Sequence, residues 1–106
     1  MLQPLFVRQD KMFKKIQPEE VVVIVAEKNY TKIFLSDRSH YLVRSKLSDA
    51  LKKLPSGMFI QIHRSIAVSV HYINDISRDH LVIDSEPIPI GKRFYRSMVE
   101  KLNVIE

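Results

Sequence analysis

Short runs of β-branched and aromatic residues alternate with polar turns along most of this chain of 106 residues. Runs of this length and composition are typical of β-strands, in which side chains of that shape pack well. The pattern therefore predicts a mainly β domain. The expected strands cover residues 5–8, 12–16, 21–26, 30–35, 40–43, 59–62, 67–70, 73–77, 80–83 and 87–90.

Several joins between these runs are short enough to be hairpins. Residues 36–39 link two alternating runs, and Arg78 with Asp79 links another two. The polar side chains at these joins tolerate tight turns. Because loops this short connect antiparallel neighbours, we expect antiparallel sheets.

Two segments have the hydrophobic period of a helix. The first covers residues 46–54, follows Ser45 as its expected N-cap, and ends before Pro55. Its apolar stripe is predicted to pack the helix onto the sheet. The stripe consists of Leu47, Ala50, Leu51 and Leu54.

A second helical pattern begins near Gly91 and runs to Leu102, with Lys92 and Arg93 in its first turn. Cations at a helix N-terminus are unfavourable because the helix dipole repels them. One interpretation is that a bound anion compensates for this repulsion. The alternative is that both side chains are simply exposed, at a small energetic cost.

Composition restricts the class of protein. The chain is 45% hydrophobic, which suits one domain with a single modest core, and it has no cysteine for disulfides or thiolate metal sites. Its longest apolar run, residues 21–26, is too short to cross a membrane. The N-terminus lacks the features of a secretory signal, so we expect a cytoplasmic protein without membrane association.

The charge balance favours a polyanionic partner. Seventeen Lys and Arg residues against twelve Asp and Glu residues give a formal charge of +5, which suits a nucleic acid. A basic surface that is only solvated has the same composition. The positions of the cations along the chain are therefore needed to distinguish a nucleic-acid partner from a basic surface that is only solvated.

Motifs of common enzymes and metal sites are missing. The sequence has no GxGxxG, P-loop, HExxH or GxSxG pattern, and its acidic residues are mostly isolated. The histidines have no ligand spacing, so neither a zinc site nor a nuclease metal site is predicted. We expect no catalytic activity, no cofactor and no metal. The histidines are His40, His63, His71 and His80.

Three short segments place cationic or amide side chains at junctions between the expected elements. Loops that project from a rigid β framework are common places for binding residues. Arg and Lys read guanine, Asn reads adenine, and Ser or a backbone amide holds a phosphate, so the segments are candidates for contact with DNA. They are Lys28, Asn29 and Tyr30; His63, Arg64 and Ser65; and Gly91, Lys92 and Arg93.

Some of these residues have a structural alternative. Asn29 is a residue type that accepts a left-handed turn conformation. His63 is in phase with Phe59 and Gln61 on one strand face, which favours a hydrogen-bonded residue beneath the loop over a base contact. Arg64 follows a strand whose apolar residues are already accounted for, so its guanidinium should be exposed.

At these segments the sequence resembles the LytTR family of bacterial transcription regulators. The resemblance rests on four stretches in family order, which together span most of the chain from Phe6 to Leu102. The third is the most specific, because its Phe, His, Arg and Ser match the family core. The stretches are VIVAEKNYTKIFL from residue 23, YLVRSKLSDALKKL from residue 41, FIQIHRSIAVSVHYI from residue 59 and IPIGKRFY from residue 88.

The resemblance implies a fold and a function. The fold would be an elongated arrangement of small antiparallel sheets with one short central helix and a short C-terminal helix. Loops would enter successive major grooves of double-stranded DNA, and the Asn29 loop, Arg64 and the pair of Lys92 and Arg93 would touch it. The sequence departs from the family at Gln61, where a basic residue is frequent, at Ser69, which replaces an asparagine, and at Gly91, which replaces a serine.

The family also implies a setting in two-component signalling. Its domains usually follow a receiver domain, for which this chain has too few residues, so we expect an excised output domain or a short regulator. We expect a monomer in isolation that pairs on two repeated DNA half-sites. The alternative is a protein-interaction module that pairs through a sheet edge such as residues 5–8. A third possibility is RNA binding, but the sequence offers no platform of aromatic side chains on which bases could stack, since its Tyr and Phe residues mostly fall in phase with the core.

Overall fold

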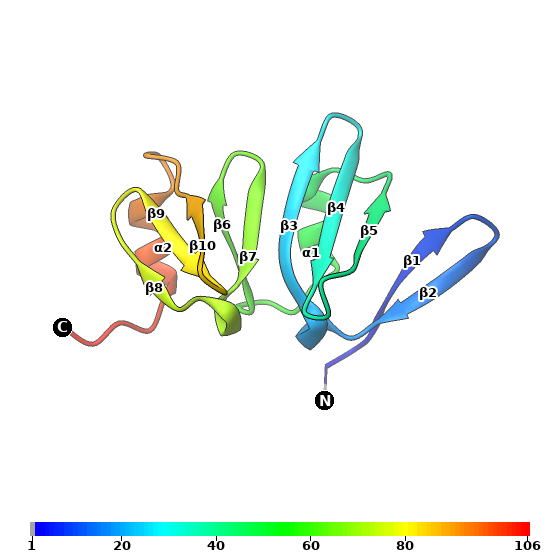
Figure 1. The fold of residues 1–106 in the computed structure, drawn as a ribbon, viewed down its shortest axis with the longest axis horizontal. Helices are drawn as coiled ribbons and strands as arrows, with labels where there is room; N and C mark the ends of the chain where they lie inside the picture. Colours follow the sequence, from blue (N-terminus) through cyan, green and yellow to red (C-terminus); the bar gives the residue numbers. More distant parts are fainter. Residues whose placement is uncertain (1) are drawn as a thin grey trace.

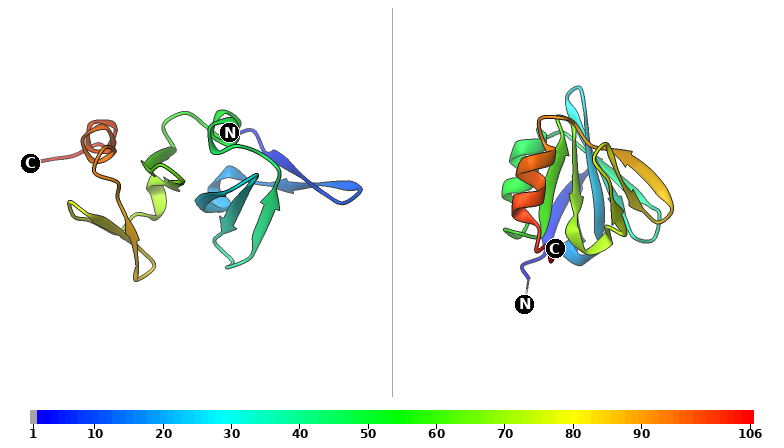
Figure 2. Two further views of the ribbon diagram at one scale, coloured as in Figure 1. Left: turned by 90° about the horizontal axis from the view of Figure 1, so that it is seen from above. Right: turned by 90° about the vertical axis from the view of Figure 1, so that its left-hand side faces the viewer.

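The computed structural model describes residues 2–106, which form ten strands in three antiparallel sheets, two α-helices and two short 3-10 helices (Figure 1). The molecule measures 48 × 32 × 25 Å, and α1 and α2 lie apart along its long axis (Figure 2). The elongated, mainly β architecture expected from the sequence is confirmed. The elements are β1 (Leu5–Gln9), β2 (Met12–Ile16), η1 (Pro18–Glu20), β3 (Val21–Glu27), β4 (Tyr30–Leu35), β5 (His40–Val43), α1 (Leu47–Lys52), β6 (Phe59–His63), β7 (Ile66–Ser69), η2 (Val70–Tyr72), β8 (Asp75–Ile76), β9 (His80–Ile83), β10 (Glu86–Pro89) and α2 (Tyr95–Lys101).

A five-stranded sheet in the order β5-β4-β3-β7-β6 forms the centre of the molecule. Two tight hairpins build it, β3–β4 and β6–β7, and they join where β3 pairs antiparallel with β7. The β3–β7 pairing brings together residues 41 to 45 positions apart, such as Val23 and Val68. The β3–β4 turn and the β6–β7 turn therefore lie at the same end of the strands of this sheet.

Two hydrophobic clusters fill the molecule instead of the single core that composition suggested. Alternate side chains of a strand point to opposite faces, and neighbours on β7 divide accordingly: Ala67 belongs to one cluster and Val68 to the other. The first cluster packs α1 and the β1–β2 hairpin against the sheet, and the second packs α2 and the β8–β9–β10 sheet. Both faces of the sheet at β7 are therefore covered, and the buried residues are distributed over two clusters instead of one.

A β-bulge in β3 changes which side chains of that strand join each cluster. The pairing of β3 with β4 shifts between Val21 and Val23, so Val22 is an extra residue in the ladder. Val21 consequently joins the first cluster together with Ile24, whereas Val22 and Val23 both contact the second. Strict alternation would have placed Val21 and Ile24 on opposite faces.

The β1–β2 hairpin projects from the end of the molecule next to β5 (Figure 1). Leu5 and Val7 face the first cluster and cover it. The opposite face of the hairpin is open to solvent, with Phe6 57% and Phe13 61% exposed. The hairpin therefore has an apolar surface that nothing in residues 2–106 covers.

Both helices are shorter than the periodicity predicted. The side chain of Ser45 does not cap α1, because Lys46 occupies the N-cap position and the Ser45 hydroxyl instead donates to the Lys46 carbonyl. The predicted stripe is confirmed, since Leu47 and Leu54 are buried in the first cluster and Leu51 packs against it. The second helix, α2, begins at Tyr95 and not near Gly91.

The strand expected over residues 73–77 is reduced to β8, which has two residues. The preceding segment forms the 3-10 helix η2, which also removes Val70 from the expected strand 67–70. Ser69 begins η2, because its hydroxyl accepts a hydrogen bond from the His71 N–H at 3.3 Å. Within residues 2–106 the structure has no helix long and apolar enough to span a membrane.

Candidate nucleic-acid interface

The three segments identified in the sequence lie at turns along one edge of the molecule, the upper edge in Figure 1. Backbone hydrogen bonds join them in a row. The Ala26 N–H donates to the Ser65 carbonyl at 2.8 Å, and the Gly91 N–H donates to the Ile62 carbonyl at 2.8 Å. The fold thus brings together segments that are far apart in the sequence. We call residues 28–30, 63–65 and 91–93 together the turn row.

The β3–β4 turn contains two residues, Lys28 and Asn29, and both are exposed. Lys28 adopts a positive φ of 49°, whereas Asn29 does not have a positive φ. The left-handed position considered for Asn29 is therefore occupied by its neighbour. The Asn29 side chain is exposed, so its amide can serve as a donor and acceptor for a ligand.

Tyr30 begins β4 directly after this turn and is 38% exposed. Arg44 follows β5 and donates from Nη2 to the Tyr30 hydroxyl at 3.3 Å, with its guanidinium carbon 5.6 Å from the ring centre. The hydrogen bond raises the pKa of Arg44 above its already high value. The buried Thr31 hydroxyl donates to the Ser45 carbonyl at 2.7 Å, which fastens β4 to the residues after β5.

The β6–β7 turn is braced from inside. The His63 Nδ1 lies 3.1 Å from the Ser65 hydroxyl and accepts the Ser65 N–H at 3.2 Å, which supports the structural interpretation of His63. Gln61 donates from Nε2 to the carbonyls of His63 and Arg64 at 3.0 and 3.3 Å. The exposed Arg64 side chain therefore projects from a turn whose backbone is held in place.

The third segment packs closely against the end of β6. A Cβ added to Gly91 would lie 3.1 Å from Phe94 Cδ2 and 3.7 Å from His63 Cα, so this position has little room for a side chain. Lys92 and Arg93 are exposed in the turn that precedes α2. They are not in the first turn of the helix as predicted, and the argument from the helix dipole does not apply to them.

In the described part of the chain, the basic side chains of the turn row are not paired with carboxylates. Within residues 2–106, neither Arg64 nor Arg93 forms an ion pair, and the same holds for Lys28 and Lys92. By contrast, Arg38, in the β4–β5 turn at the other end of these strands, pairs with Asp84 at 3.2 Å. The cations of the row therefore have their hydrogen-bonding capacity available for an anionic ligand.

Two residues of the site were not identified from the sequence. No local sequence pattern marks Arg44, because only strand pairing places it beside Tyr30. The sequence places Gln61 on the same strand face as His63 and marks it as a departure from the family pattern, but the role of its amide in bracing the Arg64 turn is not predicted. Its spacing is a local indication of this role, because Gln61 precedes His63 by two residues on the same strand and so shares a face with it.

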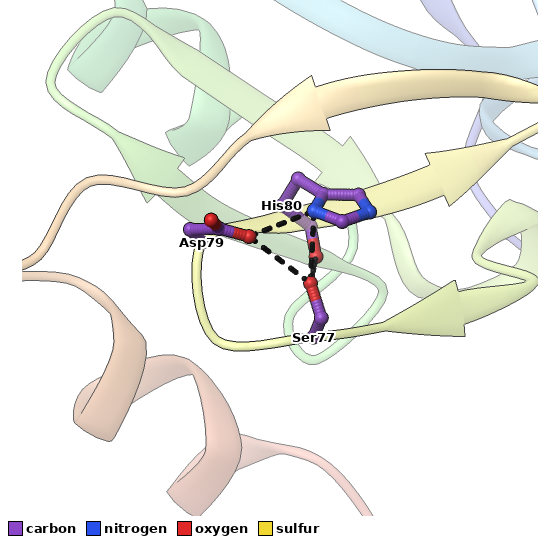
Figure 3. A network of polar contacts seen from close by, with 3 residues as sticks. All are labelled: Ser77, Asp79 and His80. Atoms are coloured by element: carbon purple, nitrogen blue, oxygen red, sulfur yellow. Dashed lines mark hydrogen bonds and ion pairs between the residues drawn. The ribbon is translucent and has the colours of Figure 1, made fainter.

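The β8–β9 hairpin contains a serine, an aspartate and a histidine in mutual contact (Figure 3). Asp79 Oδ1 lies 2.8 Å from His80 Nδ1, and the Ser77 hydroxyl lies 2.9 Å from the same nitrogen. A catalytic triad needs the two oxygens on different ring nitrogens. This cluster therefore differs from a triad and stabilises the turn. Residues 2–106 contain no group of three or more His, Cys, Asp or Glu side chains placed to hold a metal ion.

Comparisons with known proteins agree with the resemblance. A family model described as the LytTr DNA-binding domain matches residues 11–103. An uncharacterized response regulatory protein of Vibrio cholerae is 36% identical over 85 residues, which cover 73% of this chain and 33% of that protein. The sensory transduction protein LytT of Enterococcus faecalis is 23% identical over 95 residues, or 84% of this chain and 39% of that protein. The chain thus spans between a third and two fifths of the length of these relatives.

A solved structure has the same fold. It is the LytTr DNA-binding domain of a Bacillus cereus protein described as a methyl-accepting/DNA response regulator. It superposes with a TM-score of 0.81, covers 95% of this chain and 97% of that one, and is 20% identical in sequence. At this identity the likeness establishes the fold.

Proposed function

Because the chain belongs to the LytTR family of DNA-binding domains, we propose that it binds a specific sequence of double-stranded DNA through its turn row and acts in transcription regulation. The observation that carries this proposal is the gathering of three turns with unpaired cations on one edge. A merely solvated basic surface does not require its cations to gather on braced turns. Phosphate binding by such turns would supply most of the affinity.

The dimensions of the row suit a DNA groove. The β3–β4 and β6–β7 turns are two strand spacings apart in the central sheet, or about 10 Å. The major groove is about 12 Å wide, so the two hairpin turns match its width. The molecule is 48 Å long, which exceeds the roughly 34 Å of one turn of DNA. The row continues from these two turns to residues 91–93, so we propose that it contacts more than one groove on one face of the duplex.

Five residues of the row have a proposed role that follows from their chemistry. Arg64, on a braced turn, has the planar fork that pairs with guanine O6 and N7, and Asn29 has the amide that pairs with adenine. Lys92 offers a mobile point charge for a phosphate, whereas Arg93 is able to serve a base or a phosphate. Ser65 is proposed as part of the support, because its N–H and hydroxyl both contact His63.

The setting of the binding event follows from the relatives. These are named response regulatory or sensory transduction proteins and are longer than this chain. We propose that the domain works alongside a receiver domain in such a regulator, as a monomer that pairs on two repeated half-sites. Pairing raises the local concentration of the second domain and compensates for the small contact area of one.

A protein partner is the second candidate function, and the exposed face of the β1–β2 hairpin is the observation in its favour. Phe6 and Phe13 are opposite Lys15 and Arg8 in the strand register, so all four side chains share this face. Its positive charge would repel a second copy of the same face. It suits a domain that presents apolar side chains together with carboxylates.

Selection from a randomised pool of DNA duplexes tests the proposed function. The domain is mixed with the pool, bound duplexes are recovered by gel shift, and the recovered molecules are sequenced. We expect one short motif to be enriched, in two copies, by the natural chain and to be lost with Arg64→Ala. Enrichment of no motif, or equal enrichment by both proteins, would contradict sequence-specific binding by the turn row. Replacement of Phe6 and Phe13 by serine should leave the enriched motif unchanged.

A further inference from the structure

Two arginines outside the turn row share an arrangement that the rest of the site does not have. Arg44 lies against Tyr30, with its guanidinium carbon 5.6 Å from the ring centre, and Arg78 lies against Tyr95 at 5.4 Å. Stacking on a ring holds the planar group in place by cation–π attraction while leaving most N–H donors exposed. Within residues 2–106 neither arginine forms an ion pair.

These two pairs flank the turn row on opposite sides. Arg44 follows β5, the strand beyond β4 in the sheet order, and contacts the residue next to the β3–β4 turn. Arg78 is in the β8–β9 turn, whose Asp79 carbonyl accepts the Ile90 N–H at 2.9 Å, one residue before Gly91. Hydrogen bonds therefore connect the Arg78 turn to the third segment of the row, link the segments of the row, and connect Arg44 to Tyr30.

We propose that Arg44 and Arg78 bind phosphates of the duplex at the two ends of the turn row, each held in position by its tyrosine ring. This inference rests on the proposed function and extends the contact row beyond the three turns. A guanidinium that is already ordered loses less side-chain entropy when it forms hydrogen bonds with a phosphate. Among residues 2–106, Asp79 pairs with His80 and forms no ion pair with the adjacent Arg78.

Phosphate contacts at the ends of the row would affect how its turns align on the bases. Phosphate contacts fix the register and orientation of a protein on DNA but carry no base information. Contacts at both ends would prevent the row from pivoting about Arg64, so the two arginines set the alignment of the base-reading turns. Their loss should weaken binding to cognate and unrelated duplexes by the same factor.

The salt dependence of binding by the whole chain tests the inference. Each lost phosphate contact should reduce the log–log slope by about 0.9, so Arg44→Ala and Arg78→Ala should each lower it by that amount and the double variant by about 1.8. Between 200 and 50 mM salt, the affinity ratio of natural chain to single variant should grow about 3.5-fold. Arg44→Lys should keep the slope, because it keeps the charge, while binding more weakly.

Arg8→Ala is the matched control. Arg8 stacks on Phe13 at 4.5 Å in the same way but lies on the outer face of the β1–β2 hairpin, away from the row. We expect it to leave the slope unchanged. If Arg44→Ala or Arg78→Ala behaves like Arg8→Ala while Lys92→Ala lowers the slope, the inference is overturned and the proposed function stands. If the natural chain itself shows a flat salt response, the proposed function fails as well.

Discussion

Arg64 and Arg38 are both exposed arginines in hairpin turns of the central sheet, but their surroundings differ. Arg38 is engaged by Asp84 at 3.2 Å, whereas Arg64 forms no ion pair in the described part of the chain. The backbone under Arg64 is held by His63 and Gln61, so the guanidinium extends from a fixed base. A rigid base and an unengaged fork are the two properties that readout of a guanine requires.

Replacement of Arg64 by alanine is therefore expected to lower affinity for the cognate duplex by about 1 to 3 kcal/mol without changing the fold. Asn29→Ala and Arg93→Ala should act in the same direction. Fluorescence anisotropy measures the affinity, and circular dichroism checks the fold. Arg38→Ala is the control, and it should cost much less. Unchanged affinity in all three row variants would show that the base-reading residues are misassigned.

Asp79 offers a titration that reports the β8–β9 turn directly. Hydrogen bonds from His80 and then Ser77 hold its pKa below the ordinary value of 3.8. The charged form is thus favoured by folding, so its contribution to stability is present above pH 3.8 and is lost as the pH falls through the lower folded value. Carbon-13 NMR should find a carboxyl midpoint below 3.8, and His80→Ala should move it upward. A midpoint at or above 3.8 in the natural chain would contradict this contact.

At the level of elements, α1 is a packing element. Its stripe meets the first cluster through Leu47, which is 7% exposed, and the following Leu54, which is 9% exposed. Leu51 lies between them and is only partly buried. A helix of this length has little stability in isolation, so contact with the sheet has to maintain it.

Leu47→Ala is expected to lower the free energy of unfolding by roughly 2 to 5 kcal/mol, which is enough to unfold a marginal domain. Leu51→Ala should cost less than Leu47→Ala because part of its side chain is already solvated. Urea denaturation measures both, and Leu42→Ala, at an exposed strand position, is the control. A small loss of stability together with a large loss of binding to a protein partner would instead identify α1 as an interaction surface.

The shape and charge of the whole molecule determine how it would approach DNA. Its formal charge is +5, and the unpaired cations of the turn row lie along one edge of a body 48 Å long. Long-range attraction would orient that edge toward a polyanion before contact. The hairpin with its exposed phenylalanines lies at the β5 end of the body and remains available to a protein.

Salt dependence separates the two candidate functions. About five phosphate contacts predict a log–log slope near −4 to −5, so raising salt from about 50 to 200 mM should weaken DNA binding several hundredfold. A partner held by the apolar hairpin would show far less dependence, because exposed charges contribute little to such a contact. The measurement is a titration series at several salt concentrations. A flat response with every duplex tested would favour the protein-interaction function.

Pairing on DNA predicts a spacing. Two domains that bind the same face of the duplex need half-sites about 10 to 11 base pairs apart, or a multiple of that distance. Footprinting of the selected sequences should find this repeat, and insertion of about five base pairs between the half-sites should weaken binding by turning one site to the opposite face. Analytical ultracentrifugation should find a monomer without DNA. A single short site with full affinity would contradict pairing.

The sequence by itself determined the features that depend on near neighbours. Alternation of apolar and polar residues located the strands, and the spacing of Leu47, Leu51 and Leu54 located α1 and its buried side. The motif around His63 and Arg64 identified the family, which the comparisons confirm. These features could be predicted because side-chain periodicity and turn preference act over a few residues.

Only the tertiary structure decided which distant segments meet. The pairing of β3 with β7 places the Lys28 turn beside the Arg64 turn, and strand pairing alone puts Arg44 against Tyr30. A bulge at Val22, which no local pattern indicated, places Val21 and Ile24 in the same cluster. Such features follow from the packing energy of the whole molecule, in which many weak long-range contacts together outweigh local preference.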